Sequence, residues 1–287
     1  MRLSGFSFVR NGSLYDYPFV ESIQSILPIC DEFVLAVGKS EDDTLERIKA
    51  LREPKIRILE TVWDESLREG GVVLAQQTNL ALDRVKGDWA FYLQADEVVH
   101  EHDLANITDA LQTHDSDAST EGFLFDFKHF YGSFAYVGNS RRWYRHEIRI
   151  IRNGMGVRSW GDAQGFRVNG RKLRVRKVGA SIFHYGWVKS PTRQQGKQKS
   201  FNRYWHDDQW ILNHVGVSDE YDYTTGGRLV SFDSVHPSVM ARRINGQQWN
   251  FHYDPEKVQR PLKERVLDWF EDKTGLRIGE YKNYKLL

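Results

Sequence analysis

Residues 89–97 read WAFYLQADE, an uncharged run followed by two adjacent carboxylates. Such runs are typical of central strands in parallel sheets, which are covered on both faces. Ligands of open α/β sheets bind beyond the carboxyl ends of these strands. A strand over residues 89–95 would therefore carry Asp96 and Glu97 to the ligand-binding edge of the sheet. Adjacent carboxylates there suit a hard divalent cation that shares its ligands with phosphates. The alternative is a surface turn that begins with an acidic pair.

The chain before this strand alternates between strand-like and helix-like patterns. Strands are predicted over residues 4–10, 32–37 and 55–62. Each is followed by a predicted helix, in which apolar residues recur at spacings of three and four. The third helix runs from about residue 74 to residue 85. This alternation predicts an α/β fold with a mostly parallel central sheet flanked by helices.

The pattern changes after residue 121, where strands are predicted over residues 122–132, 147–152 and 172–178. A polar stretch over residues 192–214 is expected to be helical. A last helix is predicted over residues 262–273, where one face carries Leu262, Val266, Trp269 and Phe270. Neither repeats nor a linker-like segment interrupts the chain. One domain with a mixed α+β extension at its C-terminal end is therefore expected.

The composition is that of an ordinary globular protein, with 40% apolar and 28% charged residues. A single cysteine, Cys30, excludes a disulfide framework and a multi-cysteine zinc site, and we expect it to be buried. The first residues lack the apolar run of a signal peptide, and no window is apolar enough to span a bilayer. A cytoplasmic location is expected, with peripheral contact at the inner face of the membrane left open.

The net charge of +1 is unevenly distributed. Residues 141–177 hold twelve Lys and Arg but only two acids, Glu147 and Asp162. Their charge is therefore +10, and that of the remaining chain is −9. Such a local excess favours an anionic partner, for example the phosphates of a nucleotide, a glycolipid or a nucleic acid.

Six short segments form an ordered series: VRNG at 9–12, SEDDT at 40–44, TNLAL at 78–82, GDW running into QADE at 87–97, RIIR at 149–152 and HYG at 184–186. Their order resembles that of glycosyltransferase family two, whose members have the GT-A fold. The resemblance covers about residues 4–190. It implies a catalytic domain over residues 1–190, divided into a nucleotide-binding half (1–130) and an acceptor-side half (131–190). Residues 191–287 would form a mainly helical extension.

The resemblance also implies roles for individual residues. A sugar would move, with inversion, from a nucleotide-sugar donor to a hydroxyl of a glycan or lipid-linked acceptor, as in envelope polysaccharide assembly. Asp96 and His184 would hold Mg²⁺ or Mn²⁺, which assists departure of the diphosphate. Asp162 is the first candidate for the general base, with Glu97 and Glu147 in reserve. The donor nucleotide would be bound, besides Asp96, by Asn11, Asp42, Asn79 and Arg149.

Two positions depart from the family pattern. Gln94 replaces the first aspartate of the D-x-D motif, so Asp96 is left as the firm metal ligand. Val37-Gly38 stands where the family places an aspartate that holds the nucleotide, which leaves the base and the sugar open.

Other functions remain open at this point. The basic segment 141–177, with Trp143, Tyr144 and Trp160, could bind RNA or another anion. A near-neutral chain without an RNA-binding motif argues against nucleic acid. A glycoside hydrolase with a carboxylate pair and a non-catalytic relative of the transferases are further alternatives.

Overall fold

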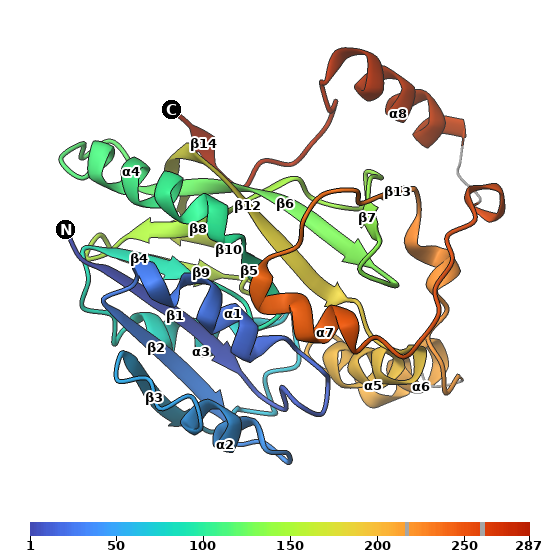
Figure 1. Ribbon diagram of the computed structural model, residues 1–287, viewed down its shortest axis with the longest axis horizontal. Helices are drawn as coiled ribbons and strands as arrows, with labels where there is room; N and C mark the ends of the chain where they lie inside the picture. Colours follow the sequence, from blue (N-terminus) through green and yellow to red (C-terminus); the bar gives the residue numbers. More distant parts are fainter. Residues whose placement is uncertain (216–217, 259–261) are drawn as a thin grey trace.

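A computed structural model describes residues 1–215, 218–258 and 262–287. Its centre is a mixed sheet that begins at one edge with four parallel strands (Figure 1). In spatial order these are β3 (Ile56–Thr61), β2 (Glu32–Gly38), β1 (Leu3–Val9) and β4 (Trp89–Tyr92). The strands predicted for the first half of the chain are thus present and parallel.

The sheet continues beyond β4 with strands from the second half of the chain. The antiparallel strand β8 (His146–Arg152) lies between β4 and β6 (Gly122–Tyr131). Next to β6 runs the long strand β12 (Arg174–Trp187), which is parallel to it. On its other side β12 pairs antiparallel with the short β5 (Glu97–Val99). This arrangement confirms the predicted fold class, an α/β fold with a mostly parallel central sheet.

Both faces of the sheet are covered, because successive side chains of a strand point to opposite sides. One core cluster contains Leu3 and Val9 of β1, whereas Phe6 of the same strand belongs to the other. The first cluster is completed by α1 (Phe19–Ile26), α2 (Thr44–Lys49) and α4 (Leu104–His114). The second is completed by α3 (Val72–Leu82) and by a small sheet of β9 (Val157–Trp160), β10 (Gly165–Val168) and β11 (Arg171–Lys172). Cys30 is buried in the first cluster, as expected.

Two strands differ in length from the sequence-based expectation. The strand predicted over residues 89–95 ends at Tyr92, because residues 94–97 form a turn closed by the Glu97 N–H on the Gln94 carbonyl (3.0 Å). Asp96 therefore lies in a turn between β4 and β5. The strand predicted over residues 172–178 continues to Trp187, since β6 supplies a partner along most of its length.

The C-terminal region returns to the sheet at several places. Its longer helices are α5 (Pro191–Asn202), α6 (Asp208–His214) and α8 (Leu262–Thr274), and α7 (Ala241–Asn245) is short. The strand β13 (Leu229–Ser231) pairs with β7 (Tyr136–Gly138), and β14 (Lys285–Leu286) pairs with β12. Single turns of 3₁₀ helix occur at Leu27–Ile29, Glu101–Asp103, Tyr223–Gly226, Ser238–Met240 and Pro255–Lys257.

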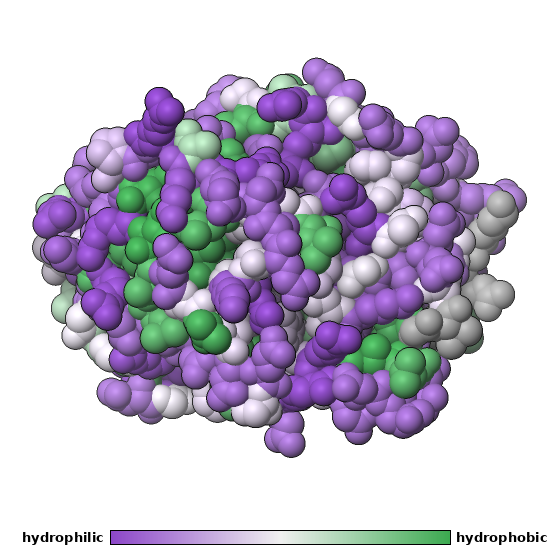
Figure 2. All heavy atoms as spheres, turned by 90° about the horizontal axis from the view of Figure 1, so that it is seen from below, coloured by the Kyte–Doolittle hydropathy of each residue, from purple (hydrophilic) through white to green (hydrophobic). Residues whose placement is uncertain are grey.

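The apolar residues of α8 point away from the core. Leu262 and Trp269 are 72% and 63% exposed, and the helix lies at the outer margin of the molecule (Figure 1). The face seen in Figure 2 is largely hydrophilic, with a broader hydrophobic area on its left. Within the described residues, no helix has both the length and the apolar character needed to cross a membrane.

Candidate active site

The turn that carries Asp96 is fixed by backbone and side-chain hydrogen bonds. The Tyr185 N–H of β12 donates to the Asp96 carbonyl (2.8 Å), and the Ser22 hydroxyl of α1 donates to the Gln94 carbonyl (2.9 Å). The Gln94 N–H in turn donates to the Glu97 carboxylate (3.1 Å). Three elements thus hold this turn, so Asp96 occupies a defined position at the carboxyl end of β4.

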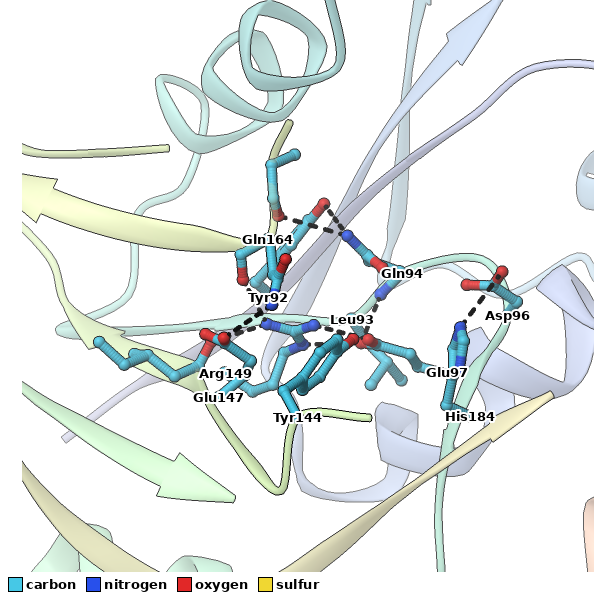
Figure 3. A network of polar contacts seen from close by, with 12 residues as sticks. Tyr92, Leu93, Gln94, Asp96, Glu97, Tyr144, Glu147, Arg149, Gln164 and His184 are labelled. Atoms are coloured by element: carbon cyan, nitrogen blue, oxygen red, sulfur yellow. Dashed lines mark hydrogen bonds and ion pairs between the residues drawn. The ribbon is translucent and has the colours of Figure 1, made fainter. Parts of the chain in front are cut away.

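Glu97 points away from Asp96 and forms a fully buried ion pair with Arg149 of β8 (Figure 3). The guanidinium donates to both carboxylate oxygens, at 2.6 and 2.7 Å. Its remaining donor reaches the carbonyls of Ile148 and Gln164, both at 3.0 Å. Although burial opposes it, the Glu97 carboxylate raises the pKa of Arg149 above its ordinary value. This geometry gives both residues a structural role and leaves Glu97 no free oxygen for proton transfer.

The Asp96 carboxylate is only 9% exposed and faces two nitrogen atoms. Its Oδ2 lies 3.3 Å from Lys197 Nζ of α5 and 3.7 Å from His184 Nε2 of β12. Burial alone would raise the pKa of Asp96. The ammonium group of Lys197 and the contact with His184 outweigh burial, so the pKa of Asp96 falls below its usual range. This shift favours the carboxylate form of Asp96.

A chain of hydrogen bonds behind His184 fixes the orientation of its ring. His129 Nε2 lies 2.8 Å from the Tyr144 carbonyl, which can only accept, so this nitrogen donates. Burial, followed by the neighbouring His184, lowers the pKa of His129 and keeps its ring neutral. Its Nδ1 therefore accepts the hydrogen bond from His184 Nδ1, 3.0 Å away. The other ring nitrogen of His184, Nε2, faces Asp96 Oδ2 at 3.7 Å.

This pair fits the ligand set of a divalent cation. Metal-binding histidines commonly donate their other N–H to a fixed acceptor, as His184 does to His129. Gly186 lies beside the pair. A Cβ at this position would be 2.6 Å from both Asp96 Oδ2 and His184 Nε2, so a residue without a side chain leaves room there. No group of three or more His, Cys, Asp or Glu suited to a metal exists among the described residues. The pair would hold a cation that takes its remaining ligands from phosphate oxygens and water.

The pair lines a cavity of about 370 Å³. One part of its wall is polar, with Asp96, Gln94, His184, Lys197, Asp162 and Gln164. Another part consists of neighbouring aromatic rings. The ring centre of Trp63 lies 5.8 Å from that of Phe8 and 5.4 Å from that of Tyr204, and the ring centres of Phe201 and Trp205 are 4.4 Å apart. The cavity suits a ligand with an anionic part and a flat part.

Two further candidate acids differ in their access to this cavity. Asp162 lies in its wall, half-buried, and accepts a hydrogen bond from the Gln164 N–H (3.3 Å). Among the described residues no cation lies within ion-pair distance of Asp162, and Arg158, four residues before it, pairs with Asp83 instead. Glu147 is not part of the wall; its carboxylate accepts from the Gln164 side chain (2.9 Å), and burial raises its pKa to about 7.

The other predicted nucleotide-binding residues serve local structure. Asn11 accepts the Glu41 N–H (2.8 Å), and Asp42 accepts the N–H groups of Leu14 and Thr44 (2.6 and 3.0 Å). Asn79 of α3 accepts the Ser159 N–H of β9 (2.9 Å). With Arg149, these residues are not among the described residues that line the cavity. The structure therefore brings together Asp96, His184 and Asp162 from the predicted set.

The basic segment 141–177 is largely neutralised by acids from elsewhere in the chain. Two of its arginines share the buried Glu121, for example, at 2.7 and 3.1 Å. Eight of its twelve Lys and Arg form ion pairs, among them Arg141–Glu271, Arg145–Glu280, Arg149–Glu97, Arg158–Asp83, Arg171–Glu121, Arg174–Glu121, Arg176–Asp117 and Lys177–Asp126. Most of the local excess of charge is thus paired with acids of the same chain, which weakens the argument for an anion-binding surface.

Sequence reasoning missed His129 and Lys197, which contact the predicted metal ligands. His129 precedes Phe130 in an aromatic strand, where an alternation with polar residues was the visible signal. Lys197 lies beyond the region that the resemblance covers. Its signal was a helix without an apolar stripe, which nevertheless buries Gln194, Gln195 and Lys197.

No protein-family model and no curated protein matches this sequence. Among solved structures, TarS from S. aureus is 14% identical with a TM-score of 0.39, over 76% of this chain and 41% of that one. A structure of TarS residues 1–349 in complex with UDP-GlcNAc is 12% identical with a TM-score of 0.40, over 76% of this chain and 68% of that one. A third structure is that of glucosyl-3-phosphoglycerate synthase from Mycobacterium tuberculosis in complex with Mn²⁺, UDP and glucosyl-3-phosphoglycerate. It is 21% identical with a TM-score of 0.30, over 45% of this chain and 44% of that one. The chain thus covers less than half of full-length TarS or the synthase, and at these TM-scores the likeness assigns no residue a role.

The raised pKa of Glu147 makes stability depend on pH. Between about pH 4.5 and pH 7 the folded protein keeps a proton that the unfolded chain releases, so stability falls as pH rises through this window. The full effect is about 3 kcal/mol. Glu147→Gln removes the titrating group and therefore this loss. The free energy of unfolding of the variant, relative to that of the wild type, should rise as the pH increases through this window. Urea unfolding of both proteins at about pH 5 and pH 8 measures this change. Glu69→Gln, at an exposed position, serves as the control. The assignment is contradicted if wild type and Glu147→Gln differ in unfolding free energy by the same amount at both pH values.

Proposed function

We propose that this protein is a glycosyltransferase that moves a sugar from a nucleotide-sugar donor to a hydroxyl acceptor. The observation that carries the proposal is the Asp96–His184 pair, which opens beside Gly186 into a cavity at the carboxyl end of β4. The ordered sequence segments that resemble glycosyltransferase family two support it independently. A glycan or a lipid-linked sugar is the acceptor class that the resemblance favours, and inversion is the expected stereochemistry.

The two walls of the cavity would bind different parts of the donor. The nucleoside base would stack near Trp63 and Tyr204, since a flat base gains from contact with aromatic rings. The diphosphate would lie at Asp96 and His184. A divalent cation held by these two residues supplies positive charge that stabilises the departing diphosphate. His129 orients the His184 ring so that its Nε2 faces Asp96.

Asp162 is the proposed general base. Its carboxylate lies in the cavity wall without a cation to hold it, so it is available to accept the proton of the acceptor hydroxyl. The hydroxyl oxygen then bonds to the anomeric carbon while the bond to the diphosphate breaks. Burial raises the pKa of Glu147 to about 7, but Glu147 lies outside the wall, so it ranks second.

Donor binding is tested by thermal unfolding with UDP, GDP and their sugar conjugates, each with and without Mn²⁺ or Mg²⁺. A nucleotide that binds the folded state alone raises the melting temperature. We expect a rise of a few degrees that requires the metal for its full size. Asp96→Asn should lose the metal-dependent part because it removes the anionic ligand. If no nucleotide and no nucleotide sugar stabilises the wild type, the transferase proposal is wrong.

The general base is tested by transfer of the donor sugar to water, which replaces the unidentified acceptor. With the best-binding UDP-sugar as probe, Asp162→Asn should lower the rate of hydrolysis about 100-fold, the usual size of a general-base contribution. Its affinity for the donor should remain that of the wild type. Glu147→Gln should keep most of the rate. The reverse ranking of the two variants would make Glu147 the base.

The role of His129 is tested by metal affinity. His129→Phe removes the acceptor for the His184 Nδ1–H, and changes of this kind weaken metal binding roughly 10- to 100-fold. Titration of Mn²⁺ in the presence of UDP, followed by electron paramagnetic resonance, measures it. His236→Phe is a matched control, because His236 is also enclosed by aromatic rings but bonds to Tyr185 and Phe134 instead. Equal Mn²⁺ affinities of the wild type and His129→Phe would exclude this orienting role.

A further inference from the structure

Lys197 has a buried ammonium group that the mechanism above does not use. It lies in the second turn of α5, its side chain is 9% exposed, and it forms part of the cavity wall. A buried lysine is costly unless its charge and its hydrogen-bond donors are satisfied. Its contacts therefore indicate what the cavity is built to receive.

The protein satisfies two of the three N–H groups of this ammonium. One donates to Asp96 Oδ2 (3.3 Å) and one to the Gly186 carbonyl (2.9 Å). Among the described residues no third acceptor lies within hydrogen-bond distance. Aromatic rings occupy the surroundings: the nitrogen lies 4.9 Å from the centre of the Tyr17 ring and 6.0 Å from that of Phe201. A ligand oxygen in the cavity would complete the set of acceptors.

The same carboxylate oxygen serves Lys197 and the proposed metal site. Asp96 Oδ2 faces both Lys197 Nζ and His184 Nε2. One carboxylate cannot neutralise an ammonium and a divalent cation together, so the two cations repel each other until a further anion enters. A diphosphate carries enough negative charge for both, and its oxygens accept hydrogen bonds from an ammonium.

We propose that Lys197 is a catalytic residue of this transferase, which binds the diphosphate of the donor through its ammonium group. The inference rests on the proposed function and deepens it. As the bond between the anomeric carbon and the phosphate oxygen breaks, its electron pair stays on that oxygen. Lys197 stabilises the added negative charge by a charge-assisted hydrogen bond. The ammonium keeps its own proton, and the proton of the acceptor hydroxyl goes to the general base.

Lys189 provides a matched control from the same region. It is fully buried, and its nitrogen also lies 4.9 Å from the centre of the Tyr17 ring. It donates to the Asp16 carbonyl (3.0 Å), however, and is not among the described residues that line the cavity. Lys189→Met therefore removes a buried amino group from a similar environment, but from a position outside the cavity wall.

The experiment is calorimetric titration of UDP and of inorganic pyrophosphate, first with EDTA and then with Mn²⁺. Without metal, Lys197→Met should weaken binding of both probes at least about 10-fold, the effect of losing one charged hydrogen bond. Lys197→Arg should keep more of the affinity, and Lys189→Met should stay within about 3-fold of the wild type. The affinity of the nucleotide-free protein for Mn²⁺ should rise in Lys197→Met, because Asp96 loses a competing cation. A damaged fold cannot produce that gain.

The outcomes separate the two proposals. Equal affinities of the wild type and Lys197→Met for UDP and pyrophosphate, or an unchanged Mn²⁺ affinity, overturn the role of Lys197 and leave the transferase proposal standing. Binding of pyrophosphate through Lys197 without binding of any nucleotide overturns the transferase but supports an anion site at this lysine. Failure of both probes to bind the wild type overturns both proposals.

Discussion

The buried ion pair between Glu97 and Arg149 is the interaction on which the rest of the site depends. Two charges in the interior are stable only when both are paired and hydrogen-bonded, and removing one partner costs about 3–5 kcal/mol. Here the carboxylate also holds the Gln94 N–H, and the guanidinium also holds the Gln164 carbonyl. The pair therefore joins the turn of Asp96 to the loop of Asp162. Its geometry fixes the separation of two side chains that it does not itself touch.

The fold of residues 1–130 was predictable because its signals are local. Each parallel strand is a short apolar run and each helix has a periodic apolar face, so β1, β2 and β3 begin and end within a residue or so of the prediction. The place of Asp96 follows from the same logic, because the carboxyl end of a central strand has to lie at the edge of the sheet. The early end of β4 was not visible, since residues 93–95 are as uncharged as the strand before them.

The unpredicted features all depend on contacts between distant segments. The twelve cations of residues 141–177 looked like a binding surface because their partners are far away in sequence: Glu121 precedes them, and Glu271 and Glu280 follow about 100 residues later. A charge count along the chain cannot see such pairing. The same holds for His129 and His184, which the parallel register of β6 and β12 places side by side.

Helix α5 shows how the two parts of the chain share the cavity. Helices of globular proteins normally bury an apolar stripe, whereas α5 buries Gln194, Gln195 and Lys197. A buried ammonium group needs a polar partner, and Lys197 finds one in Asp96. The sheet contributes the carboxylate and the histidine, and the C-terminal region contributes the ammonium and the rings of Phe201 and Tyr204. A ligand that joins an anionic group to a flat base would contact both walls, which agrees with the proposed nucleotide-sugar donor.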